Sequence, residues 1–146
     1  MNAGVSPGVY AAVAAGGAFG GMLRVLVLAA WAPAPGGLPL ALLGVNAAGS
    51  CLIGLVLAFS EPGRIRRLPP GLSVGLMAGF CGALTTFSTF SVELLSLEAT
   101  GGVLYLAVSL VCWLGAAAIG LVVGRRINRP PEGGCKGNCM NRRTRC

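Results

Sequence analysis

The chain has 146 residues, of which 55% are hydrophobic and only 10% are charged, and its formal net charge is +7. A mean hydropathy of +0.80 excludes a water-soluble globular domain of this length, which needs far more charged surface. The chain contains no histidine, no aspartate and no nucleotide-binding glycine loop, so we expect a membrane protein that is not an enzyme.

Four apolar segments are each long enough to cross a bilayer as a helix, which takes about 20 residues. They cover approximately residues 7–31, 38–59, 68–97 and 102–123, and turn-forming or charged stretches separate them. The pattern predicts an all-α membrane protein. We expect a transmembrane domain over residues 1–126, followed by a basic, cysteine-containing tail over residues 127–146.

The first span contains two overlapping pairs of glycines, Gly16 with Gly20 and Gly17 with Gly21. Small residues at this spacing allow two helix backbones to approach closely. The same span contains Arg24. Its side chain either extends to the membrane interface, about two helical turns away, or lies at the mouth of a pathway.

The second and fourth spans each present a polar pair on one helix face. Asn46 and Ser50 are four residues apart, and so are Tyr105 and Ser109. Polar side chains at membrane depth are costly, and they are therefore candidates for function. Because a chain this small has little interior, we expect these faces to border a partner subunit or a cavity.

The third span is about 30 residues long, more than one crossing requires, and it contains GFCGALTTFSTFS at residues 79–91. Glycines weaken the helix here, and the hydroxyls of Thr85 and Thr86 compete for backbone groups. We therefore predict a break near mid-membrane, after which the helix resumes with Phe87 and Phe90 on one face. Carbonyl groups freed by the break are suitable ligands for a hard monovalent cation.

The residues after the break favour an anion pathway. A phenyl ring is negative on its face and positive at its edge, so Phe87 and Phe90 turned edge-on can solvate a small anion. The hydroxyls of Ser88 and Thr89 and the amide of Asn46 supply hydrogen-bond donors. No fixed lysine or arginine would trap the ion there.

The basic residues are distributed unevenly along the chain. Three lie in the second linker and seven from Arg125 to the C-terminus, whereas the N-terminus and the other two linkers contain none. The positive-inside rule then predicts a multi-pass protein of the cell membrane with both termini in the cytoplasm. The charge also favours contact with anionic membrane lipid over nucleic acid, because no aromatic residues interleave the basic tail.

The tail contains Cys135, Cys139 and Cys146. Three thiols without a fourth ligand are a weak zinc signal. We favour a reduced, disordered tail over a metal-binding one.

Three motifs resemble those of one known family. GGAFGGMLR (16–24), GVNAAGSCLIG (44–54) and GFCGALTTFSTFSVE (79–93) are similar, in order and spacing, to motifs of the Fluc/CrcB fluoride channels. These are four-span proteins that export fluoride from microbial cytoplasm. The resemblance covers about residues 10–124.

The resemblance implies an antiparallel dimer with two pores and a structural, untransported sodium ion at its centre. Main-chain carbonyls of Gly82 and Thr85 would hold the sodium. Fluoride would pass Phe87, Phe90 and Asn46, and Tyr105 with Ser109 would form a polar track. The chain departs from the family pattern at three positions: Leu42 stands where a threonine is frequent, and Cys112 and Trp113 follow the polar track.

Two alternatives remain at this point. A small multidrug exporter is also a four-span antiparallel dimer, but it needs an intramembrane carboxylate, for which Glu93 is the only candidate in this sequence. A non-transporting scaffold would explain the glycine faces but not the broken helix. The partner subunit is also open, since the one-sided charge favours an oppositely oriented homologue over a second copy of the chain.

Overall fold

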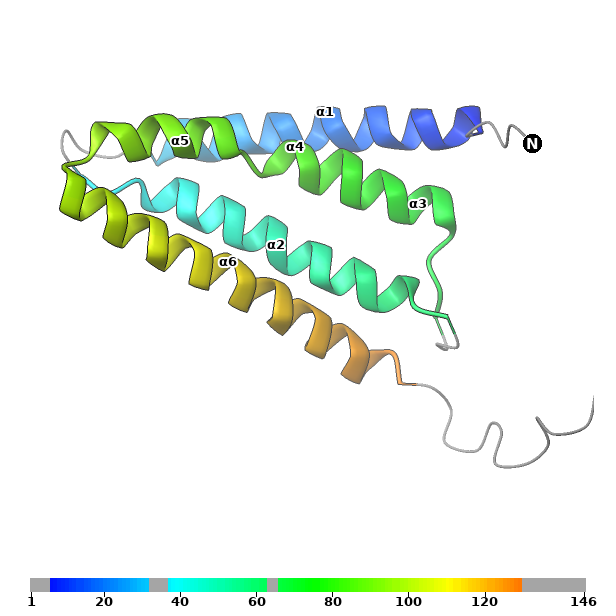
Figure 1. Cartoon of the computed structure of the whole chain (residues 1–146). Coiled ribbons are helices and arrows are strands. Elements are labelled where there is room, and N and C mark those ends of the chain that lie inside the picture. Colours follow the sequence, from blue (N-terminus) through cyan, green and yellow to red (C-terminus); the bar gives the residue numbers. More distant parts are fainter. Residues whose placement is uncertain (1–5, 32–36, 63–65, 130–146) are drawn as a thin grey trace, which may run out of the picture.

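The computed structural model describes residues 6–31, 37–62 and 66–129, and over these residues it contains helices and no strand (Figure 1). The first, second and fourth spans are continuous helices: α1 (Pro7–Ala30), α2 (Leu40–Ser60) and α6 (Ala99–Ile127). The third span consists of α3 (Pro70–Val74), the π-helical segment η1 (Gly75–Cys81), α4 (Gly82–Leu84) and α5 (Phe87–Ser96). All four are long and apolar enough to cross a membrane. The predicted four-span, all-α fold with a broken third helix is confirmed.

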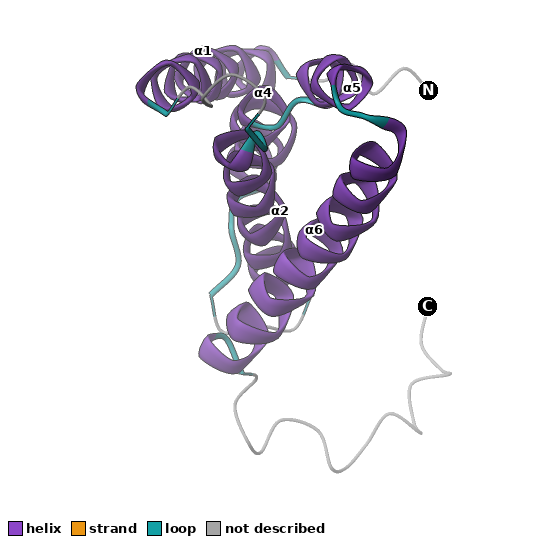
Figure 2. Cartoon of the chain, turned by 90° about the vertical axis from the view of Figure 1, so that its left-hand side faces the viewer, coloured by secondary structure: helices purple, strands orange, loops and turns teal. Residues whose placement is uncertain are grey.

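The helices pack as two pairs. The first half of the third span packs along α1, and α2 packs along α6. After the break, α5 leaves α1 and packs against α6. Figure 2 shows α5 displaced from α4 toward the side where α6 begins. The break therefore transfers the third span from one helix pair to the other.

Glycines set both close helix contacts. A Cβ atom at Gly16 or Gly20 of α1 would collide with backbone atoms of the third span, those of Phe80 in both cases. On the other pair, a Cβ at Gly54 or Gly120 would collide with backbone carbonyls across the α2–α6 contact. Backbones this close allow no side chain larger than hydrogen, as the small-residue pattern predicts.

The second glycine pair of α1 has a different environment. A Cβ atom at Gly17 or Gly21 would meet nothing within 4 Å, and the same holds for Gly115 of α6. The first pair packs inside the chain, and the second lies on its outer surface. Only one of the two overlapping pairs thus serves the fold of the single chain.

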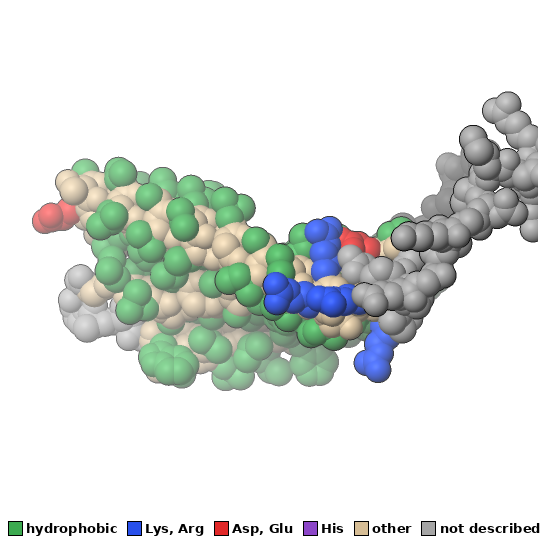
Figure 3. All heavy atoms as spheres, turned by 90° about the horizontal axis from the view of Figure 1, so that it is seen from below, with side chains coloured by type: hydrophobic (Ala, Val, Ile, Leu, Met, Phe, Trp, Pro, Cys, Tyr) green, Lys and Arg blue, Asp and Glu red, His purple; other side chains and the backbone are tan. Residues whose placement is uncertain are grey.

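The outer surface is dominated by large apolar side chains. Leucines, valines and aromatic residues are exposed along every span, and Figure 3 shows them over most of the visible face. A surface of this kind is stable only in contact with lipid or another apolar partner. The chain is a multi-pass membrane protein.

Basic side chains gather at one end of the molecule (Figure 3). Arg125, at the end of α6, forms a salt bridge with Glu61 at the end of α2, with 2.8 Å between Nε and Oε1. The buried Asn128 side chain accepts a hydrogen bond from Arg66 N at 2.8 Å and donates one to Arg66 O at 2.6 Å. These contacts attach the basic second linker to the end of α6. The three tail cysteines lie outside the described residues.

Candidate functional site

The break in the third span comprises two residues. Thr85 (ψ 151°) and Thr86 (φ −146°, ψ 124°) have extended backbones between the end of α4 and the start of α5. The Thr85 hydroxyl donates to Cys81 O at 2.9 Å, and Thr86 Oγ1 accepts from Thr89 N at 3.3 Å. Thr86 is therefore the N-cap of α5. The tandem threonines end one helix and begin the next, as the sequence predicted.

Asn46 of α2 compensates for the helix bonds that the break removes. Its Oδ1 accepts a hydrogen bond from Thr86 N at 2.9 Å, and its Nδ2 donates to Thr86 O at 3.2 Å. Both residues are buried. A buried peptide group without partners is costly, so this side chain stabilises the extended backbone. The other N–H of the Asn46 amide has no partner among the described residues and stays available as a donor.

One backbone carbonyl at the break, that of Thr85, stands apart from these bonds. Among the described residues, no hydrogen bond reaches its oxygen, which lies in the extended segment between α4 and α5. Gly82 lies on the surface of the chain. Unpaired carbonyl oxygens in an apolar setting favour a cation or a partner subunit as their neighbour.

The two phenylalanines after the break form a ring pair with centroids 6.0 Å apart. Phe90 is buried, with 1% of its surface exposed, whereas Phe87 is 74% exposed. Phe90 also contacts Tyr105 at 5.6 Å and Trp113 at 4.8 Å between centroids. Leu42, one of the departures from the family pattern, packs in the same cluster.

The polar face of α6 borders this cluster. The Tyr105 hydroxyl donates to Pro39 O at 3.1 Å. Ser109 is fully buried, and its Oγ has no hydrogen-bond partner among the described residues. One turn further on, Trp113 faces inward and Cys112 is exposed on the outside. Of the two departures expected to follow the polar track, only Trp113 lies on it.

A cavity of about 230 Å³ connects several of these residues. Its lining residues contain no charged side chain and come from α2, the break, α5 and α6: Asn46, Ser50, Ile53, Thr85, Thr86, Phe87 and Trp113. Ser88 and Thr89 are not part of this lining, and both hydroxyls are 3.2 Å from Thr86 Oγ1. Arg24 lies apart on α1 and forms no hydrogen bond or ion pair with the described residues.

The sequence placed Thr86 at the helix break and Trp113 after the polar track, but it did not indicate that Thr86 caps α5 or that Trp113 lines the cavity. Thr86 precedes Thr89 by three residues, which is a usable N-cap signal. Trp113 is four residues beyond Ser109, which places it on the face shared by Tyr105 and Ser109. Which of Cys112 and Trp113 faces inward depends on the rotation of α6 about its axis, and the sequence does not specify this rotation.

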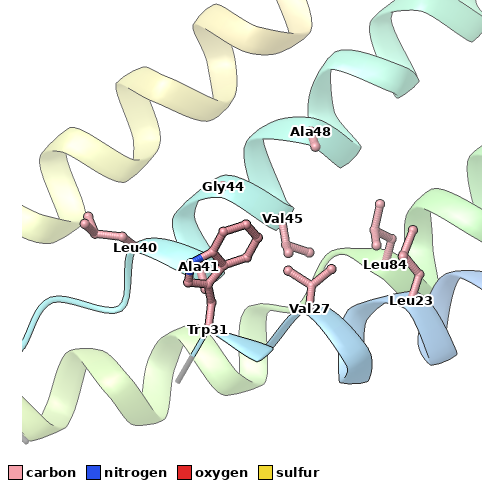
Figure 4. A pocket seen from close by; sticks show the side chains of 9 residues that line it. All are labelled: Leu23, Val27, Trp31, Leu40, Ala41, Gly44, Val45, Ala48 and Leu84. Atoms are coloured by element: carbon pink, nitrogen blue, oxygen red, sulfur yellow. The ribbon is translucent and has the colours of Figure 1, made fainter. Parts of the chain in front are cut away.

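A larger cavity of about 520 Å³ lies between α1 and α2 (Figure 4). Leu23 and Val27 of α1 face Val45 of α2 there, and Leu84 lies beside them. Its walls are almost entirely aliphatic, apart from Trp31. Such walls offer an anion no hydrogen bonds, so we place the candidate site in the smaller cavity.

Comparisons with known proteins identify the family of this chain. The family model for CrcB-like proteins, described as "Camphor Resistance (CrcB)", matches residues 11–121. A fluoride-specific ion channel of Bradyrhizobium diazoefficiens is 40% identical over 126 residues, covering 83% of this chain and 87% of that protein. One from Bacillus subtilis is 44% identical over 122 residues, with 82% and 89% covered, and one from Saccharophagus degradans is 36% identical over 123 residues, with 82% and 91% covered. With matches over this length, the chain belongs to the CrcB-like family.

Proposed function

We propose that this protein is a fluoride-specific ion channel that allows fluoride to leave the cytoplasm passively. The observation that carries the proposal is a cavity at the helix break, lined by Asn46 and Phe87 without charged side chains, where Phe87 forms a ring pair with Phe90. The relatives named fluoride-specific ion channels support the choice of ion.

The cavity offers a small anion weak ligands of the right sign. The edge of a phenyl ring is positive; Phe87 lines the cavity and Phe90 packs against Phe87. One N–H of Asn46 is available as a donor. The Ser109 hydroxyl does not line the cavity, but it has no hydrogen-bond partner among the described residues and is also able to donate. Each of these contacts is weaker than an ion pair, so the anion can lose water and still leave.

Passive conduction is enough for export. Hydrogen fluoride is a neutral weak acid that crosses membranes and dissociates in the cytoplasm. The membrane potential, negative inside, then drives the fluoride anion outward through any selective pore. Export therefore needs no coupled ion or nucleotide.

The functional unit that we propose is an antiparallel dimer. The exposed ring of Phe87, the open glycines Gly17 and Gly21 and the apolar outer surface would find partners in a second subunit. That subunit is either a second copy of this chain or an oppositely oriented homologue. Both termini of this chain are proposed to be cytoplasmic, because all described linker and tail arginines lie at one end.

A structural sodium ion fits the break. The carbonyl oxygens of Gly82 and Thr85 would hold it, two from each subunit, and that of Thr85 has no hydrogen bond among the described residues. Oxygen ligands without a carboxylate suit a hard monovalent cation. Sodium would supply a positive charge that joins the two broken helices, and it would not be transported.

A proton-coupled multidrug exporter is not favoured. Such a protein needs a carboxylate inside the membrane, and Glu93 is the only one within the described spans. Glu93 lies one turn from the end of α5, away from the cavity lining.

The test is ion efflux from liposomes that contain the purified protein. We expect rapid fluoride efflux and no measurable chloride efflux. Comparable rates for the two anions would refute the assignment. Proton-dependent uptake of a cationic dye without fluoride efflux would favour the exporter instead.

Variants of the ring pair test the anion chemistry. Phe87→Ile and Phe90→Ile keep apolar bulk but remove the positive ring edge, so we expect a severe loss of fluoride efflux in protein that still elutes as wild type. If both rings serve only packing, these variants would either fail to assemble or conduct normally.

A further inference from the structure

Trp113 is a residue whose position within the candidate site becomes clear only in the structure. It lies on α6 four residues after Ser109 and eight after Tyr105, on the same helix face. Its side chain lines the 230 Å³ cavity together with Asn46 and Phe87. A half-buried indole at a cavity wall also occurs in ordinary core packing, so its contacts decide what it does.

The closest ring contact of Phe90 is with Trp113. Their centroids are 4.8 Å apart and their planes are inclined by 71°, an edge-to-face arrangement. The contacts of Phe90 with Tyr105 and Phe87 are longer, at 5.6 and 6.0 Å, and less steeply inclined, at 33° and 42°. A perpendicular neighbour at this distance obstructs rotation of the phenyl ring about its Cβ–Cγ bond.

The two aromatic neighbours of Phe90 on α6 are themselves fixed to α2. The Trp113 indole N–H donates to Leu43 O at 3.4 Å, and the Tyr105 hydroxyl donates to Pro39 O at 3.1 Å. Leu43 and Pro39 are four residues apart, so the two tethers reach successive turns at the start of α2. Phe90 is therefore held between rings whose polar groups are anchored to a third helix.

A fixed ring plane matters for anions in particular. The edge of a phenyl ring attracts an anion and its face repels it, so a quarter turn of the ring reverses the sign of the interaction. We propose that Trp113 is a positioning residue of the ion pathway, which holds the Phe90 ring in the plane that presents its edge to fluoride. This role rests on the proposed fluoride conduction and extends it to a residue at which the chain departs from the family pattern.

The test measures rotation of the Phe90 ring and efflux of fluoride in separate experiments. A 3-fluorophenylalanine introduced at position 90 reports ring rotation by ¹⁹F NMR in fluoride-free buffer, since its two ring orientations give separate lines only when they exchange slowly. Fluoride efflux from liposomes is measured on the unlabelled proteins. The variants are Trp113→Leu, which removes ring and tether, and Trp113→Phe, which keeps a ring and loses the N–H. Leu114→Ala, at a lipid-exposed neighbour, is the matched control.

In the wild type and in Leu114→Ala, we expect two ¹⁹F lines, because the ring at position 90 changes orientation slowly. In Trp113→Leu we expect a single averaged line and fluoride efflux at least tenfold lower than in the wild type. Trp113→Phe should be intermediate in both measurements, with efflux two- to fivefold lower, and it serves as the deciding variant if Trp113→Leu does not elute as wild type. Unchanged ring exchange in both Trp113 variants would overturn the proposal, and so would a freed ring with normal efflux. The NMR measurement does not depend on transport. If the Phe90 ring of the wild-type protein rotates slowly but the protein shows no fluoride efflux, the channel function is refuted, whereas the effect of the Trp113 contact on the ring is still established.

Discussion

At Ser109, a contribution to folding stability can be distinguished from a contribution to ion transport. Its hydroxyl is completely buried and has no hydrogen-bond partner in the part of the chain that the structure describes. A buried, unpaired polar group costs about 1–3 kcal/mol of folding free energy. A residue that serves only the fold would not be expected to keep this cost, so we infer that the hydroxyl serves the transported ion.

Ser109→Ala should therefore have opposite effects on stability and on transport. We expect an unchanged or higher melting temperature, because the unpaired group is removed, and about tenfold slower fluoride efflux, because a donor to a charged species is lost. Ser96→Ala is the control, since the Ser96 hydroxyl bonds to Glu93 O at the end of α5. Normal efflux in Ser109→Ala would show that the hydroxyl does not contact the ion.

At the scale of the elements, the third span owes its shape to another helix. Its threonines end and restart the helix, but the extended peptide of Thr86 is held by Asn46, 40 residues away on α2. The π-helical η1 precedes the break and packs against α1, where its glycines Gly75 and Gly79 lie against the α1 backbone. The segment is thus clamped on both sides of the break, by α1 before it and by α2 at it.

The α2–α6 contact gives a matched pair of glycine substitutions. Gly120→Ala should lower the melting temperature by several degrees, because the new Cβ would collide with Cys51 O, and overpacking costs about 1–3 kcal/mol. Gly115→Ala, five residues earlier on the same helix, meets nothing within 4 Å and should be neutral or stabilising, since alanine favours a helix over glycine by about 1 kcal/mol. Thermal unfolding in detergent measures both. Equal effects would mean that the contact does not depend on backbone approach.

At the scale of the whole molecule, the charge distribution bears on assembly. Ten of the eleven basic residues lie in the second linker and from Arg125 to the C-terminus. An antiparallel dimer needs two subunits inserted in opposite directions, and a bias this strong should insert nearly every copy with its termini in the cytoplasm. We therefore expect an oppositely oriented homologue to supply the second subunit.

Expression of this gene alone tests that expectation. A membrane-impermeant maleimide applied to intact cells should label almost none of the tail cysteine Cys146, and lysed cells should label it fully. Fluoride resistance should appear only when a homologue is co-expressed. Substantial labelling from outside would instead indicate dual insertion and a homodimer.

The proposed sodium ion also belongs to the assembled molecule, because its ligands would come from Gly82 and Thr85 of both subunits. We expect fluoride efflux to fall when sodium is exhaustively replaced by a bulky organic cation, since the two broken helices would lose the charge that joins them. Recovery on adding sodium back distinguishes a specific site from damage to the protein. Efflux that is insensitive to the replacement would remove support for the site.

The sequence alone determined the features that depend on neighbouring residues. The four spans follow from runs of apolar residues, the proposed orientation follows from a count of basic residues, and the position of the break follows from Gly82, Thr85 and Thr86. The family could also be identified, because its motifs are short and contiguous. Each of these signals is local, and none requires knowledge of how the helices face one another.

The tertiary structure decided which sides of the helices meet. In a membrane the helices are apolar all round, so hydrophobic periodicity, which identifies the buried face of a helix in soluble proteins, gives little information. The sequence could not show that Gly16 and Gly20 pack inside while Gly17 and Gly21 face outward, or that Trp113 rather than Cys112 borders the site. These outcomes depend on the rotation and register of whole helices, which contacts between distant residues set.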